Sequence, residues 1–212
     1  MTFSLISSPA VSGLSGLSAP AHAVRMTAAR DGLNLGEACG AVLLSSEGTE
    51  EHVILSGGAV SNDANHISGP SRTGDGLYFA IRQAMQEAGT APQDISFVNA
   101  HGTATVYNDE MESKALTLAH LEQVPVHSLK PYFGHTLGAS GIIESIVCMH
   151  ELKQGILFGT PGYENAGSSY ADTGLCHPPE HPDETLRKNR FGIRRMQRSH
   201  CLIFTGIYSV QR

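Results

Sequence analysis

Residues 124–153, VPVHSLKPYFGHTLGASGIIESIVCMHELK, contain the clearest structural pattern in the chain. The first six, Val124–Leu129, predict a short strand. In Ala139–Lys153 the apolar side chains recur at helical spacing, and Gly155 follows as a stop signal, so a helix is predicted there. The glycine-containing segment Lys130–Gly138 between them is predicted to be a loop. A strand joined by a short loop to an amphipathic helix is typical of a layered α/β protein.

The same alternation extends toward the N-terminus. A helix is predicted over Ser71–Gly89, where Leu77, Ile81 and Met85 share one face. A second helix is predicted over Asp109–Leu121, opened by an Asn108/Asp109 cap with Glu112 three residues later. Strands are predicted at the end of Asp31–Leu44, in Glu51–Val60 with a possible bulge at its glycine pair, and in Ile95–His101. We therefore expect residues 1–29 to be irregular and residues 30–212 to form one α/β domain.

Composition excludes several classes of function. The 212 residues include 41% hydrophobic and 16% charged residues, and the formal net charge of -6 argues against nucleic-acid binding. No apolar run is long enough to span a bilayer, and Met1–Ala23 lacks the basic start of a secretory signal. Four scattered cysteines indicate reduced thiols in a cytoplasmic protein. Prolines within Cys176–His181 disfavour a metal site there, so no metal is expected.

Two histidines occupy positions that suit catalysis, because each follows a predicted strand and sits among glycine and small hydroxylic residues. The segments are Asn99-Ala-His-Gly-Thr-Ala-Thr105 and Lys130-Pro-Tyr-Phe-Gly-His135. Two neutral imidazoles that converge on one oxygen can stabilise an enolate or oxyanion. The alternative is that each histidine only satisfies a turn, which is the ordinary interpretation of an isolated histidine.

Three segments together resemble one family. NAHGTAT at 99–105 with Asp109 and Glu112, K…GHTLGASGIIE at 130–144, and RDGLNLGEACG at 30–40 resemble the corresponding segments of β-ketoacyl-acyl carrier protein synthases, in the same order. The resemblance implies the C-terminal half of a thiolase-like fold, a layered αβα arrangement with a mixed five-stranded sheet. It also implies decarboxylation of a malonyl thioester followed by Claisen condensation with an acyl group held on a cysteine.

The resemblance also implies roles for individual residues. His101 and His135 would stabilise the enolate, and Glu144 would hold Lys130, which orients the site. The phosphopantetheine arm of the acyl carrier protein would contact Thr103, Thr105 and Phe191. No cofactor of the enzyme's own is implied, since the phosphopantetheine belongs to the carrier protein. The expected partners are acyl carrier protein and either a second copy or a polypeptide that supplies the missing half.

The chain also departs from the family pattern. The family's nucleophilic cysteine lies upstream of these motifs, and none of the four cysteines here replaces it. From Phe191 onward, arginines replace the family's glycine-rich turn, and the end of the chain is off-pattern. We therefore expect the chain alone to be incomplete for condensation, and a non-catalytic partner or truncated remnant is the alternative. A degradative thiolase is disfavoured, because that class uses a second cysteine where this chain has histidines.

Overall fold

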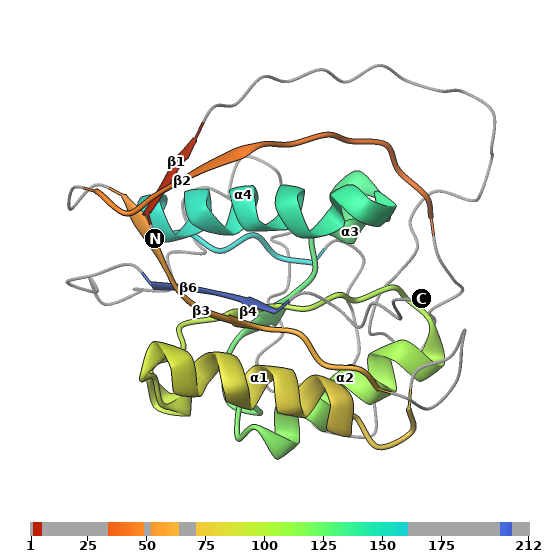
Figure 1. Ribbon diagram of the computed structural model, residues 1–212. Helices are drawn as coiled ribbons and strands as arrows, with labels where there is room; N and C mark the ends of the chain where they lie inside the picture. Colours follow the sequence, from red (N-terminus) through yellow and green to blue (C-terminus); the bar gives the residue numbers. More distant parts are fainter. Residues whose placement is uncertain (1, 6–33, 49–51, 64–70, 161–199, 205–212) are drawn as a thin grey trace.

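The computed structural model describes residues 2–5, 34–48, 52–63, 71–160 and 200–204 (Figure 1). Strands and helices alternate through this part of the chain. The strands are β1 (Thr2–Leu5), β2 (Val42–Ser45), β3 (Val53–Ala59), β4 (Val98–Asn99), β5 (Val126–His127) and β6 (His200–Phe204). The helices are α1 (Asp75–Ala88), α2 (Val106–Leu118), α3 (Lys130–Phe133) and α4 (Ser140–Gln154), with 3-10 turns at Pro92–Asp94 and Leu137–Ala139.

The elements form layers, as predicted. Figure 1 shows α4 on one side of strands β3, β4 and β6, and α1 and α2 on the other side. A four-stranded sheet has the order β2-β1-β3-β6, in which β1 is antiparallel to its neighbours and β3 is parallel to β6. Strands β4 and β5 form a separate parallel pair. The expected five-stranded sheet is therefore, within the described residues, a mixed sheet of four strands and a parallel sheet of two.

Helices α1 and α4 form where the apolar spacing predicts them. Leu77, Ile81 and Met85 of α1 are buried, and Gly89 and Gly155 end α1 and α4 in the left-handed conformation. Helix α1 packs directly against β3 at Gly57. A side chain at this position would not fit, since an added Cβ would lie 2.4 Å from the backbone oxygen of Ala84 in α1. No helix in the described segments is both long and apolar enough to cross a membrane.

The main core lies between α1, α2 and the β4–β5 pair. It buries apolar side chains from all four elements and from the turns that join them: Leu77, Ile81, Met85, Val98, Ala100, Met111, Ala115, Leu116, Ala119, Leu121, Val124 and Val126. Burying each large aliphatic side chain contributes roughly 1.5–3 kcal/mol. This core anchors the strand ends that lead into the two histidine segments.

The structure corrects three predictions of local structure. Residues 2–5 form β1 although the N-terminal segment was expected to be irregular, because pairing with β2 and β3 supplies hydrogen bonds that no local pattern reveals. Helix α2 begins at Val106 and not at Asp109, and its cap residue Thr105 makes no side-chain capping bond. The predicted loop after β5 contains the helical turn α3.

Candidate active site

His101 and His135 lie side by side, which is the arrangement that the catalytic prediction requires. Their ring centroids are 5.0 Å apart and their planes meet at 87°. His101 follows β4, and His135 follows α3 in the connection from β5 to α4. Parallel pairing of β4 with β5 places the ends of both strands at the same edge, so the segments that follow them converge there.

The ring of His135 is held in one tautomer. Its Nδ1 accepts the backbone N–H of Leu137 at 3.2 Å and lies 2.9 Å from Ser140 Oγ. A ring nitrogen that accepts an N–H bond carries no proton, so the neutral imidazole carries its hydrogen on Nε2. His135 therefore presents an Nε2–H donor, which is the group needed to stabilise a negatively charged oxygen.

The backbone of His135 is fixed by the segment 34–36. His135 N–H donates to Asn34 O at 2.7 Å, and Gly36 N–H donates to His135 O at 3.1 Å. Gly134 has φ +73°, and a Cβ there would lie 2.8 Å from Gly36 N. A Cβ on Gly36 would in turn lie 1.8 Å from Phe133 O. Both glycines are thus required for the close approach of two backbone segments, and the approach sets the position of the His135 ring.

The backbone at His101 is held by a buried carboxylate. Glu112 of α2 accepts the N–H of His101 at 2.7 Å and that of Gly102 at 2.8 Å, one on each oxygen. Burial raises the pKa of Glu112 to about 7, although the two N–H donors act in the opposite direction. Gly102 has φ +48°, and a Cβ there would lie 2.6 Å from Ser128 Oγ. Glu112 and Gly102 therefore set the turn that aims His101.

Lys130 and Glu144 form a buried ion pair. Lys130 Nζ lies 2.6 Å from Glu144 Oε1, and the side chains are 0% and 13% exposed. The second oxygen of Glu144 accepts the amide of Asn99 at 3.0 Å. This triad connects β4, α3 and α4, the elements that flank the two histidine segments. Its geometry fits a lysine that orients the site without exchanging protons.

Thr103 and Thr105 lie next to His101 and contact each other. Their hydroxyl oxygens are 2.9 Å apart, and the Asn108 amide donates to Thr103 Oγ1 at 2.9 Å. Thr103 is buried, whereas Thr105 is half-buried at the start of α2. Thr105 is therefore the more accessible of the two for a ligand. Phe191, the third residue expected to contact the carrier arm, lies outside the described residues.

Sequence reasoning missed several residues that build the site. Glu112 was predicted to cap α2, but its carboxylate binds the backbone of the histidine turn. Asn99 and Ser140 were seen only as members of their motifs, whereas they bind Glu144 and the His135 ring. The sequence signal for Glu112 was its place, with Asp109, in the motif that begins with the 99–105 segment. The contacts themselves depend on tertiary structure.

Residues 52–164 match the family described as "Beta-ketoacyl synthase, C-terminal domain". Among curated relatives, the chain is 36% identical over 146 residues to 3-oxoacyl-[acyl-carrier-protein] synthase 2 of Vibrio cholerae, covering 64% of this chain and 35% of that protein. It is 34% identical over 134 residues to the polyketide biosynthesis malonyl-ACP decarboxylase PksF of Bacillus subtilis, covering 60% of this chain and 32% of that protein. The chain thus spans about a third of the length of these relatives.

Solved structures give the same result. A type II polyketide ketosynthase in complex with its acyl-carrier protein aligns with a TM-score of 0.64 at 27% identity, over 73% of this chain and 40% of that one. The ishigamide ketosynthase/chain length factor aligns with a TM-score of 0.63 at 28% identity, over 76% of this chain and 40% of that one. The predicted fold class, a C-terminal thiolase-like half, is confirmed by these neighbours.

Proposed function

Since this chain belongs to the β-ketoacyl synthase family, with that family's C-terminal domain at residues 52–164, we propose that it forms the histidine half of a condensing-enzyme site. The substrate class is a malonyl thioester carried by acyl carrier protein, in fatty-acid or polyketide biosynthesis. The observation that carries the proposal is the contact between the His101 and His135 rings, whose centroids are 5.0 Å apart.

The chemistry follows from what two neutral imidazoles can do. Decarboxylation breaks the bond between the malonyl carboxylate and the α-carbon, CO2 leaves, and the electron pair moves into the thioester as an enolate. The negative charge develops on the thioester oxygen, and N–H donors aimed at that oxygen stabilise it. His135 suits this role because its Nδ1 accepts a hydrogen bond from Leu137 N–H, so the neutral ring carries its hydrogen on Nε2. His101 is the second donor in the proposal.

The condensation step needs a further group. The enolate carbon attacks the carbonyl of an acyl-cysteine thioester, the new carbon–carbon bond forms, and the cysteine thiolate leaves. We propose that this cysteine comes from the other half of the site, contributed by the same longer chain or by a partner subunit. Structural relatives include ketosynthases bound to a carrier protein or paired with a chain length factor. No metal or organic cofactor enters this chemistry, because the phosphopantetheine arrives on the carrier protein.

A role without condensation is the second candidate. One relative, from Bacillus subtilis, is named a malonyl-ACP decarboxylase, so decarboxylation is the activity of one member of the group that this chain resembles. The motifs here contain the histidines and the Lys130–Glu144 pair but no cysteine nucleophile. Decarboxylation alone is therefore the activity to measure first.

The test is decarboxylation of malonyl-acyl carrier protein by the purified chain, followed as CO2 release. We expect turnover above background, and a loss of at least about 100-fold in the His101→Ala/His135→Ala variant, the size expected when oxyanion donors are removed. His150→Ala is the matched control, because His150 is an exposed histidine on α4. No turnover by a folded wild-type chain, or equal loss in the control, would contradict the proposal.

A further inference from the structure

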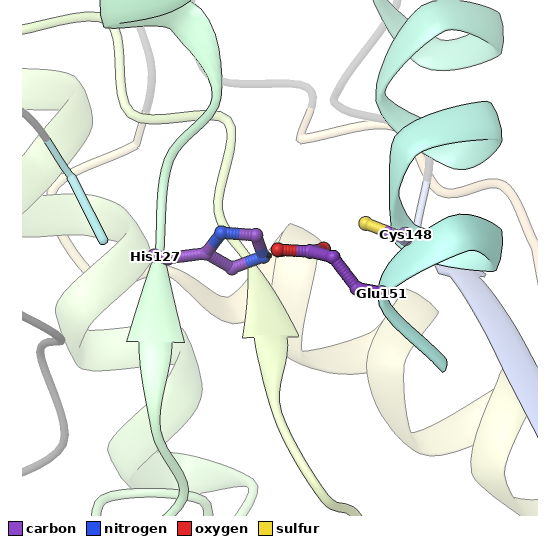
Figure 2. A group of neighbouring side chains, drawn as sticks. All are labelled: His127, Cys148 and Glu151. Carbon is purple, nitrogen blue, oxygen red and sulfur yellow. Dashed lines mark ion pairs between the residues drawn. The ribbon is translucent and has the colours of Figure 1, made fainter. Parts of the chain in front are cut away.

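Three side chains with metal-binding atoms meet at a position that the proposed reaction does not use. They are His127 at the end of β5 and Cys148 and Glu151 on α4 (Figure 2). One ligand atom from each lies within 4.8 Å of the other two. All three residues are buried, with His127 and Glu151 at 0% exposure. Cys148 and Glu151 are three residues apart on one helix, so they project from the same face toward the strand.

Two of the three side chains are incompletely satisfied within the described part of the protein. Both ring nitrogens of His127 and the Oε2 atom of Glu151 are buried without a hydrogen bond of normal geometry. The nearest polar groups are the Phe158 backbone beside His127 and the Cys148 thiol beside Glu151. Burying a polar group in this way costs about 1–3 kcal/mol. Such groups require an explanation, and a bound ion is one of the accepted explanations.

The geometry of the closest pair suits a shared metal ion. His127 Nε2 and Glu151 Oε2 are 3.5 Å apart, and Figure 2 shows the imidazole and the carboxylate facing each other. Two ligands at ~2.1 Å from a tetrahedral Zn²⁺ are separated by ~3.4 Å. Cys148 Sγ would have to move inward by at most about 1 Å to reach the corresponding N/O–S separation. The pair therefore needs little adjustment to hold an ion.

The neighbouring backbone orients the carboxylate for this purpose. Phe158 N–H donates to Glu151 Oε1 at 2.8 Å, which leaves Oε2 directed at His127. A ligand whose second atom is held by a backbone donor is typical of protein metal sites. The Phe97 ring packs against the His127 ring at 5.5 Å in an edge-on arrangement and keeps the imidazole in place.

We propose that His127, Cys148 and Glu151 form a structural Zn²⁺ site that ties β5 to α4. The mixed nitrogen, sulfur and oxygen donors favour Zn²⁺ over Mg²⁺ or Ca²⁺, which take oxygen ligands. Lys130 lies three residues after His127, and Glu144 lies two helical turns before Glu151. A metal that joins these elements would stabilise the framework that holds the Lys130–Glu144 pair, at a distance from the reacting atoms.

The competing interpretation is a metal-free neutral pair. Burial lowers the pKa of His127 to about 4 and raises the pKa of Glu151 to about 7, so burial favours the neutral form of both groups. The two interpretations differ in metal content and in the state of the Cys148 sulfur, which is a thiolate only with a metal bound.

The test measures Zn²⁺ and Co²⁺ binding by the purified full chain. We expect about one tightly held Zn²⁺ per chain by elemental analysis. Co²⁺ in its place should give a thiolate-to-cobalt charge-transfer band in the near ultraviolet. Cys148→Ala should abolish that band and weaken Zn²⁺ binding at least about 100-fold, whereas Glu151→Gln should weaken binding with the thiolate still present. Cys39→Ala is the matched control, because Cys39 is exposed, and should change neither readout.

Three outcomes would overturn the proposal. A folded wild-type chain that retains no Zn²⁺ would support the neutral pair. A Co²⁺ complex without a thiolate band would place the metal elsewhere. Equal Zn²⁺ binding by wild type and Cys148→Ala would do the same. If Cys148→Ala fails to fold, the Co²⁺ spectrum of Glu151→Gln and the metal content of the wild type still decide the question. None of these readouts depends on decarboxylation.

Discussion

Replacing Lys130 with methionine should cost far more stability than the loss of one exposed charge. Lys130 is fully buried, and its Nζ lies 2.6 Å from Glu144 Oε1. Lys130→Met keeps most of the side-chain volume. It removes the cation that pairs with Glu144, whose carboxylate then retains the hydrogen bond from the Asn99 amide. Breaking a buried pair by removing one partner costs about 3–5 kcal/mol, because an uncompensated charge stays in a medium of low polarity.

The double variant Lys130→Met/Glu144→Leu should be less damaging than either single change. It removes both charges, and two apolar side chains of similar size fill the same space. The remaining cost is the Asn99 amide, which loses its acceptor, at about 1–3 kcal/mol. The two substitutions should therefore be strongly non-additive, with a coupling energy of several kcal/mol.

Urea unfolding followed by circular dichroism measures all four members of this cycle. Lys114→Met is the control, because Lys114 is partly exposed, pairs with Glu110 at 3.6 Å and donates to Arg72 O at 2.9 Å in an exposed hydrogen bond. An exposed pair of this kind contributes less than about 1 kcal/mol. Additive single costs, or a Lys130→Met cost below about 1 kcal/mol, would refute the argument that the buried pair organises the site.

Two further predictions concern the backbone around the histidines. Burial raises the pKa of Glu112 from 4.5 to about 7 in the folded chain. The folded state therefore binds this proton more tightly than the unfolded state does. The resulting stabilisation is complete below pH 4.5 and is lost as the pH rises through 7. The free energy of unfolding of the wild type relative to Glu112→Gln should therefore fall by up to about 3 kcal/mol over this range, and a constant difference in pH-dependent urea titrations would contradict it. Gly134→Ala should lower both the thermal stability and malonyl decarboxylation, because its methyl group would lie 2.8 Å from Gly36 N at a φ of +73°. Gly138→Ala, with no atom within 4 Å of the added Cβ, should change neither, and equal effects of the two variants would show that the close approach is not required.

Local sequence patterns were sufficient to predict helices α1 and α4. The apolar spacing of α1 and α4 and their terminal glycines are short-range signals, because a helix is built from contacts between residues three and four apart. The two helix predictions are confirmed, because they depend on residues that are close together along the chain. The motif containing His101 and the motif containing His135 identified both histidines as candidates, and their catalytic role stays a prediction.

The first residue of α2 and the role of Glu112 were harder to predict, because the Glu112 side chain binds backbone groups outside its own helix. Glu112 three residues after Asp109 has the spacing of a capping box, so local reasoning assigned it to the start of a helix. In the folded chain the helix begins at Val106, and the Glu112 carboxylate satisfies the N–H groups of His101 and Gly102. The N–H groups of His101 and Gly102 can bind this carboxylate only when α2 packs beside the turn, and no local sequence pattern indicates that packing.

The sequence by itself determined which residues are chemically able to act: two histidines, a lysine with its glutamate, and the glycines that allow close backbone contacts. Only the tertiary structure decided which of them meet. It paired β4 with β5 so that the histidines converge, held the His135 ring in one tautomer through Leu137 N–H, and brought His127 to Cys148 and Glu151. The physical reason is that contacts between residues far apart in the chain are set by the packing of strands and helices, which no local pattern encodes.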